Sequence, residues 1–245
     1  MAVGRRRATR GVARKRAKRS PKEVKLSKEL ICSASLALID KKGLEAFSLR
    51  DVARSLGVYP RAIYWYVDGR TELLSEVVGY ALRDVYPPAS SGDWKDWLRK
   101  LFRQYREAVR QHPNIAPLIG ASLLSPGAMV PITIERILAV LGEAGFPEKH
   151  LVDVYNVVIA AQVGFVTLEF AMVPEGIASA EQKKRISTID VLRFPLLGRH
   201  LPSFANRAFV LRWENGTKAP LDSGFHRFVE SIISGLDRFL LESKS

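Results

Sequence analysis

The residues with the clearest chemical capacity lie between positions 59 and 66, where an arginine and three tyrosines surround a small residue. The guanidinium of Arg61 can donate two hydrogen bonds to one guanine, and the methyl group of Ala62 can contact a thymine methyl. Tyr59, Tyr64 and Tyr66 carry hydroxyl donors suited to phosphate oxygens, which position a protein on a duplex. This combination predicts a surface that binds the major groove of DNA.

Residues 48–67, SLRDVARSLGVYPRAIYWYV, supply two short helices that would position these side chains. Ser48 followed by Asp51 is a capping-box start for the first helix. Gly57 can adopt the left-handed conformation that ends it, and Pro60 suits the first turn of the next helix, where its missing N–H costs little. The pattern predicts a helix-turn-helix whose second helix reads bases.

The chain resembles the DNA-binding domain of the TetR family of bacterial transcriptional repressors over about residues 26–82. The resemblance implies an all-α fold, with an N-terminal three-helix helix-turn-helix domain and a C-terminal helical bundle for ligand binding and dimerisation. It also implies a homodimer that leaves its operator when a small molecule binds. The positions that carry the resemblance are Ala34, Gly43, Phe47, Leu49, Val52, Ala53, Leu56, Gly57, Val58, Ile63, Tyr64, Trp65 and Leu73.

The resemblance adds two basic residues to the predicted DNA contacts. Arg50 matches a position that the family uses for base or backbone contact, and Arg70 one where the family usually carries lysine. We expect Arg70 and the N–H groups of the following helix to hold one phosphate together. Tyr64 matches the family's recurrent tyrosine in the recognition helix. Residues 59–61 and the acidic Asp68 depart from the common pattern, so the operator sequence cannot be borrowed from a relative.

The remaining aromatic residue of this stretch, Trp65, is expected to pack in the core. Cys32, the only cysteine, excludes intramolecular disulfides and fits a reducing cytoplasm. We expect it to pack as a small hydrophobe, with redox sensing as the alternative. No apolar run has the eighteen residues of a membrane helix, and the N-terminus lacks the apolar region of a signal peptide.

Residues 1–25 hold eleven Lys or Arg and one acid, a net charge of +10 out of the chain's +13. With almost no large apolar side chains, this segment cannot bury enough surface to fold alone. We expect a disordered basic arm that follows the DNA backbone or enters a minor groove, with Arg14, Arg16 and Arg19 among its contacts. A solubilising tail and a transit peptide are the alternatives.

The apolar periodicity predicts helices along the rest of the 245 residues. The first is expected at 27–42, and the fourth begins with Asp68 as its N-cap and stops at Pro87 and Pro88. The polar stretch at 89–93 is the expected boundary between a DNA-binding domain at 26–88 and a ligand-binding and dimerisation domain at 93–245. In the second domain, helices are predicted at about 94–112, 114–124, a span ending near 144, 147–173, 179–192 and 222–242.

Two of these helices are the expected homodimer interface. The helix at 148–173 is apolar nearly all round and must be covered on every side, while the helix at 222–242 has one broad apolar face. Together with their symmetry mates they would form a four-helix interface. The intervening segment, 174–224, is expected to be largely irregular, either as a mobile cover for a pocket or as an arm across the dimer.

The predicted effector pocket rests on polar residues in apolar surroundings. Tyr155, Gln162 and Glu169 are seven residues apart and so form one stripe on the long helix, as a ligand pocket in a bundle requires. Satisfied core or interface polar groups are the alternative, and for His112 a role at a helix end. The further candidates, taken as core first and pocket lining second, are Trp97, Phe102, Tyr105 and Met129.

These features predict a sequence-specific transcriptional regulator, a homodimeric repressor released from a palindromic double-stranded DNA operator by a small-molecule effector. A sequence-tolerant architectural DNA binder without a ligand is the alternative. The four histidines lack metal-ligand spacing, and the chain carries no nucleotide-binding loop or catalytic elbow. We therefore expect no enzymatic activity, no cofactor and no metal.

Overall fold

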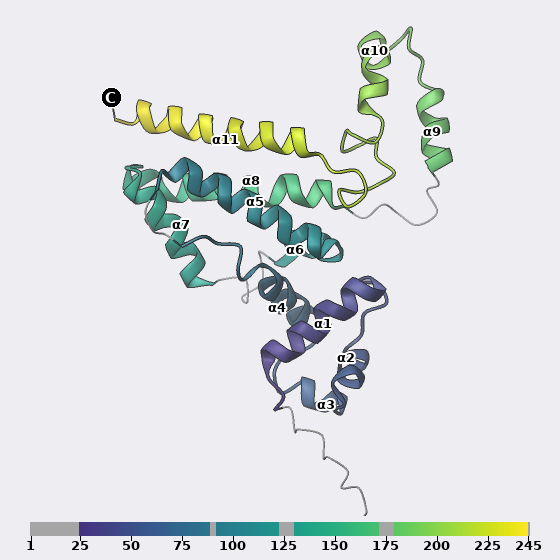
Figure 1. Ribbon diagram of the computed structural model, residues 1–245, viewed down its shortest axis with the longest axis vertical. Coiled ribbons are helices and arrows are strands. Elements are labelled where there is room, and N and C mark those ends of the chain that lie inside the picture. Colours follow the sequence, from purple (N-terminus) through teal and green to yellow (C-terminus); the bar gives the residue numbers. More distant parts are fainter. Residues whose placement is uncertain (1–24, 89–91, 123–129, 172–178, 245) are drawn as a thin grey trace, which may run out of the picture.

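The computed structural model describes residues 25–88, 92–122, 130–171 and 179–244. Within these ranges the chain forms eleven α-helices and two short 3₁₀ helices, with no strand. The all-α fold class is thereby confirmed. Helices α1 to α4 stand together below a larger bundle, and α4 lies between the two groups (Figure 1).

The first four helices share a small apolar core. Ile31, Val52, Ile63 and Leu73 come one from each helix, and all four are completely buried. Burial of one such side chain stabilises the fold by about 1.5–3 kcal/mol, so these contacts hold even the very short third helix in place. The four helices are α1 (Lys28–Lys42), α2 (Leu49–Leu56), α3 (Pro60–Ile63) and α4 (Arg70–Leu82).

The predicted starts and ends of α2 and α3 are confirmed. Ser48 Oγ accepts a hydrogen bond from the backbone N–H of Asp51 at 3.2 Å, which satisfies one free donor of α2. Gly57 ends α2 with φ 68°, in the left-handed region that glycine adopts without a steric penalty. Pro60 is the first residue of α3.

The predicted start of α4 is wrong. The helix begins at Arg70 with Gly69 as its N-cap, and Asp68 lies one residue earlier. The backbone N–H of Asp68 donates to the carboxylate of Glu72, which reaches back over the first turn. Because Glu72 caps this end, the Asp68 side chain is not needed for it and stays exposed.

The larger bundle is centred on α8, which packs against α5, α6, α7 and α11. The predicted bounds of the last helix are confirmed, whereas α8 ends at Glu169, short of the predicted 173. The elements of the bundle are α5 (Trp94–Gln111), η1 (Pro113–Ile115), α6 (Ala116–Ser122), α7 (Pro131–Glu143), η3 (Glu148–His150), α8 (Leu151–Glu169) and α11 (Asp222–Glu242).

One described segment, Glu148–Glu169, is long and apolar enough to cross a membrane by length and composition, with a mean hydropathy of 1.7. Core helices of soluble proteins meet the same criteria. This segment packs against four helices and carries two buried polar side chains, Gln162 and Glu169. We therefore interpret it as the central helix of the bundle.

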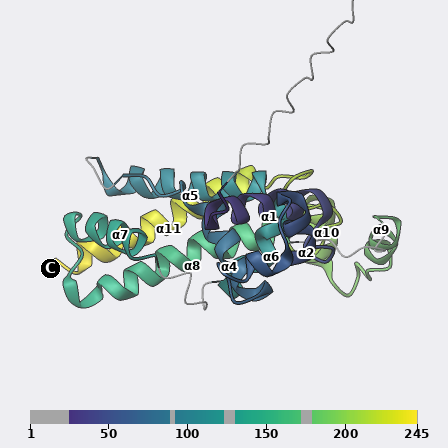
Figure 2. The ribbon, with the colours of Figure 1, turned by 90° about the horizontal axis from the view of Figure 1, so that it is seen from below.

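The segment between α8 and α11 contains more helix than the sequence predicted. Besides α9 (Ser179–Ser187), which is shorter than expected, it forms α10 (Pro195–Phe204). Asp190 orders the approach to α10, because its carboxylate accepts from the N–H groups of Leu192 and Arg193 at 3.0 and 3.1 Å. Both views place α9 at the margin of the molecule (Figures 1 and 2).

Candidate DNA-binding surface and ligand cavity

The surface built on α3 presents polar and aromatic side chains to solvent. Ile63 and Val67 are buried and hold it against the core, while Tyr59 is 86% exposed and Tyr64 56% exposed. Arg61 is exposed beside them. The other residues predicted to contact DNA here are the exposed Arg50 and the half-buried Ala62. Their roles in DNA binding stay predictions.

The expectation that Trp65 packs in the core is wrong, since its side chain is 79% exposed. Regular helix stops at Ile63, and a turn carries the chain from there to Val67. Because Ile63 and Val67 take the inward positions, Trp65 is left on the outer side of the turn. Trp65 and its sequence neighbour Tyr64 therefore both present aromatic rings to solvent.

Two predicted phosphate contacts already have partners within the protein. The hydroxyl of Tyr66 donates to the backbone oxygen of Leu26 at 2.8 Å, so its only proton is not free for a phosphate in this conformation. Arg70 donates from Nη2 to the carbonyl of Leu44 at 3.1 Å and keeps further N–H donors available. These two hydrogen bonds connect the chain at either end of α1 to the turn after α3 and to the first residue of α4.

The predicted arm contacts, Arg14, Arg16 and Arg19, lie outside the described residues. The first described residue of the chain is Lys25, and Tyr66 bonds to Leu26 immediately after it. The described part of the chain therefore begins beside the turn that follows α3.

A cavity of about 310 Å³ lies between α4, α5, α6, α7 and α8. Such a volume is at the lower end of the range for small-molecule pockets. Most of its wall is apolar, with a few polar side chains and two arginines. The lining residues are Ser75, Val78, Gly79, Leu82, Arg83, Tyr86, Tyr105, Ile119, Val130, Ile132, Thr133, Arg136, Ile159, Gln162 and Val163.

The polar groups of this cavity are only partly satisfied. Gln162 Nε2 donates to the hydroxyl oxygen of Tyr86 at 3.3 Å, but Gln162 Oε1 and Ser75 Oγ are buried without a hydrogen-bond partner in the described part of the chain. Unpaired buried polar atoms are costly, so these two oxygens favour a bound molecule. Burial raises the pKa of Tyr86 and that of Tyr105, which keeps both phenols protonated at neutral pH.

The structure brings only Tyr105 and Gln162 of the predicted pocket residues into this cavity. Phe102 is a core residue, Tyr155 is half-buried outside the cavity, and Met129 lies outside the described residues. Trp97 donates from Nε1 to the backbone oxygen of Pro88 at 2.9 Å. The prediction that the three polar residues of α8 line one pocket is wrong, because Glu169 pairs with Arg106 of α5 and Tyr155 does not line the cavity.

Glu169 belongs to a buried ion pair rather than to the cavity. Its carboxylate accepts two hydrogen bonds from Arg106 of α5, at 2.6 and 2.7 Å, and one from the backbone N–H of Leu221 at 2.8 Å. Arg106 Nη1 also lies 2.8 Å from Asp222, and this hydrogen bond lowers the pKa of the Asp222 carboxyl. A side chain at Gly216 would collide with Glu169, since an added Cβ would lie 2.5 Å from its Cγ.

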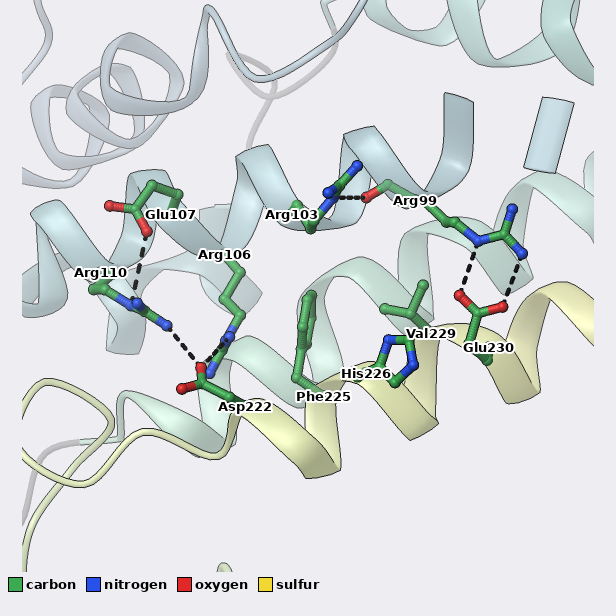
Figure 3. A pocket seen from close by; sticks show the side chains of 10 residues that line it. All are labelled: Arg99, Arg103, Arg106, Glu107, Arg110, Asp222, Phe225, His226, Val229 and Glu230. Atoms are coloured by element: carbon green, nitrogen blue, oxygen red, sulfur yellow. Dashed lines mark hydrogen bonds and ion pairs between the residues drawn. The ribbon is translucent and has the colours of Figure 1, made fainter. Parts of the chain in front are cut away.

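The same face of α5 forms further ion pairs with α11, as Figure 3 shows. Arg99 holds Glu230 with two hydrogen bonds of 2.8 Å, and Arg110 lies 3.3 Å from Asp222. These arginines are not among the residues that the sequence singled out. The seven- and four-residue spacing of Arg99, Arg106 and Arg110 on α5 was the available signal, but a row of arginines is more often solvated than paired.

His112 connects the bundle to the DNA-binding helices instead of lining the cavity. It ends α5, and its Nδ1 lies 2.7 Å from the Asp40 carboxylate of α1. Next to it, Asn114 Nδ2 donates to the backbone oxygen of Ile39 at 2.9 Å. The end of α1 is therefore tied to the start of η1, and this contact joins the two parts of the molecule beside α4.

Metal and thiol chemistry have no visible basis in the described part of the chain. It contains no group of three or more His, Cys, Asp or Glu residues that could hold a metal ion. Cys32 is buried in the core, and burial raises the pKa of its thiol to about 11. The thiol stays protonated at neutral pH, which favours the packing role over redox sensing.

Comparison with known proteins gives matches to both parts of the chain. Residues 31–77 match the family model "Bacterial regulatory proteins, tetR family", and residues 86–238 match "Tetracyclin repressor-like, C-terminal domain". The HTH-type transcriptional repressor DrrR1 of Streptomyces coeruleorubidus is 29% identical over 153 residues, which cover 61% of this chain. The match spans little more than half of that relative, 56% of its length.

Two solved structures are similar in fold. BioQ in complex with its natural double-stranded DNA operator has a TM-score of 0.53 at 26% identity, covering 60% of this chain and 88% of BioQ. ActR of Streptomyces coelicolor in complex with actinorhodin has a TM-score of 0.66 at 22% identity, covering 87% of this chain and 96% of ActR. With both parts matched in the order of the family, the chain belongs to the TetR family of transcriptional regulators.

Proposed function

We propose that this protein is a homodimeric transcriptional repressor, located in the cytoplasm, that leaves its DNA operator when a small molecule fills the cavity. The observation that carries the proposal is the position of α4 in both sites. Its first residue, Arg70, braces the DNA-binding surface, while Ser75, Val78 and Leu82 further along line the cavity. A domain boundary at 89–93 would make α4 the last helix of the DNA-binding domain.

The contacts at the end of α4 give a physical route for release. Tyr86 follows α4 and is bonded from both sides of the cavity, by Gln162 of α8 and by Arg136 of α7. A ligand that displaces these bonds changes the direction in which α4 leaves the bundle. In a dimer, the two recognition helices must lie about 34–36 Å apart to enter successive major grooves, so a change in spacing weakens both contacts. The ligand shifts the equilibrium only by its differential affinity for the two conformations.

The relatives support repression, operator binding and ligand binding. DrrR1 is a repressor by name, BioQ was solved with its DNA operator, and ActR was solved with actinorhodin. The operator and the effector that the present protein binds depend on its own side chains. Those of residues 59–61 would select the operator, and those that line the cavity would select the effector.

The test of this function is selection of bound duplexes from a random pool by the purified full-length protein. We expect a palindrome with two half-sites, and an affinity for it well above that for random duplex at physiological salt. Specific sites are typically bound about 10³–10⁷ times more tightly than non-specific DNA. A ratio near one would instead support the sequence-tolerant architectural binder.

The homodimer is proposed on the apolar faces of α8 and α11. Val152 is 67% exposed and Val157 41% exposed in the single chain. A hollow of about 340 Å³ between the two helices is lined by Val157, Ile232 and Phe239 among others. Apolar surface of this extent is covered in a stable protein, and a second copy of α8 and α11 offers a complementary face.

Val157→Arg is expected to convert the dimer to a monomer, because a long charged side chain would be forced into this apolar face and lose its hydration. The measurement is molar mass by light scattering, together with affinity for the selected operator, which falls because a monomer occupies a single half-site. Val157→Ala keeps the face apolar and serves as the control, with the dimer retained. A dimeric Val157→Arg protein would place the interface elsewhere.

Deletion of residues 1–25 is expected to lower affinity for every duplex and to flatten its dependence on salt. The slope of log K against log salt falls by about 0.9 for each phosphate that the protein no longer neutralises. Binding to operator and to random duplex is measured between low and physiological salt. A slope unchanged by the deletion would remove the arm from the DNA interface and leave it as a solubilising tail.

A further inference from the structure

The charges around the cavity define what kind of molecule it takes. We propose that the effector is an aromatic carboxylate that also carries a hydroxyl group, about the size of two fused rings. The proposal rests on the cavity being the effector site of the function proposed above. It adds the chemical class of the ligand, which follows from the arginines, the unpartnered oxygens and the volume.

The cavity wall carries positive charge without a matching negative one. Arg83 and Arg136 are among the lining residues, and no Asp or Glu is. Arg83 is engaged outside the cavity, with Asp84 at 3.1 Å and the Tyr80 ring 4.0 Å from its guanidinium carbon. Arg136 is half-buried and forms no ion pair with any residue that the structure describes. Among these residues its Nη1 donates to the backbone oxygen of Tyr86, at 3.3 Å.

Among the described residues, no Asp or Glu pairs with Arg136. The neighbouring stretch 123–129 reads LLSPGAM and contains no acid. Glu135 precedes Arg136 on α7 but is exposed to solvent, and the side chain of Asp84 is 88% exposed. A carboxylate on the ligand would therefore be the first full negative charge within reach of Arg136. A cationic ligand would meet repulsion from Arg136 in surroundings with little water to screen it.

The cavity also offers hydrogen bonds to a neutral polar group. Gln162 Oε1 can only accept, and Ser75 Oγ can donate or accept, and both are buried without a partner in the described part of the chain. Gln162 is 2% exposed, so it is well removed from solvent that could satisfy it. A ligand hydroxyl can donate to the amide oxygen and accept from the serine. Val78, Ile119 and Ile159 supply apolar walls for a flat ring system.

Such a ligand would act directly on the end of α4. Its carboxylate competes with the Tyr86 carbonyl for Arg136, while its hydroxyl bonds to Gln162, the residue whose Nε2 holds the Tyr86 phenol. A guanidinium–carboxylate pair, which can form two parallel hydrogen bonds, is stronger than a single bond from a guanidinium to a neutral carbonyl, so the carboxylate displaces the Tyr86 carbonyl. The bond from Arg136 to the end of α4 is then lost.

The test uses full-length protein and three probes that share one ring system and differ in charge, 2-naphthoate, 2-naphthamide and 2-naphthylmethylammonium, with binding measured by calorimetry. We expect the affinity order naphthoate, then amide, then ammonium. Arg136→Gln is expected to weaken the naphthoate by about tenfold or more and to leave the amide within about twofold. Arg238→Gln, which removes an exposed cation paired with Glu242 and outside the cavity lining, is the control and should leave the order unchanged.

Gln162→Leu tests the hydroxyl group of the ligand. It is expected to remove the advantage of 6-hydroxy-2-naphthoate over 2-naphthoate while both still bind better than the ammonium. A cation that binds as well as the anion, a naphthoate affinity unaffected by Arg136→Gln, or no binding of any probe would overturn the inference. The proposed repressor function is judged separately by the random-pool selection, which needs no ligand.

Discussion

Glu169→Ala is expected to lower the free energy of unfolding by about 3–5 kcal/mol. The carboxylate is fully buried, and its removal leaves the Arg106 guanidinium, 9% exposed, with only the exposed Asp222 as an acidic partner among the described residues. It also leaves the N–H of Leu221 without its acceptor. Chemical denaturation followed by circular dichroism gives the change in stability.

Two controls identify the unpaired charge as the cause. Glu242→Ala removes a carboxylate from the exposed Arg238–Glu242 pair and is expected to cost less than about 1 kcal/mol. Arg106→Met combined with Glu169→Leu removes both buried charges and should recover much of the stability that the single variant lacks. A decrease below about 1 kcal/mol for Glu169→Ala would contradict the description of this pair as a buried one.

Arg61→Ala is expected to abolish discrimination at one base pair of each half-site, at a cost of about 1–3 kcal/mol per half-site. In a dimer the substitution is present in both subunits, so the effect on the full operator exceeds the effect on one half-site. The measurement compares the selected operator with duplexes substituted at each position, by fluorescence anisotropy. The variant should bind the substituted duplex as well as the operator at the affected position.

Two matched variants separate base reading from general electrostatics. Arg238→Ala removes the same charge from an exposed site on α11 and should leave the preference unchanged. Tyr64→Phe removes a hydroxyl suited to phosphate and should weaken all duplexes equally. If Arg61→Ala reduces affinity equally for every duplex, Arg61 binds a phosphate and base reading lies with other residues.

Local sequence determined most of the helix boundaries. The cap at Ser48, the left-handed glycine at Gly57 and the proline that begins α3 each act within a few residues, so they could be read directly from the chain. The bounds of α11 followed from its apolar periodicity for the same reason. Asp68 shows the limit of prediction from local sequence, because Glu72 can also cap the start of α4 and forms the capping hydrogen bond in the structure.

The family and the helix-turn-helix also followed from sequence, since a helix-turn-helix is a short local unit whose apolar and polar positions have fixed spacing. The amino-acid sequence did not determine which polar residues on α8 meet in one site. Helical spacing places Tyr155, Gln162 and Glu169 on one side of a helix, but it does not say which neighbouring helix faces each turn. Only tertiary packing brought Arg106 to Glu169 from 63 residues away and left Gln162 facing the cavity, because such partners are set by how helices cross.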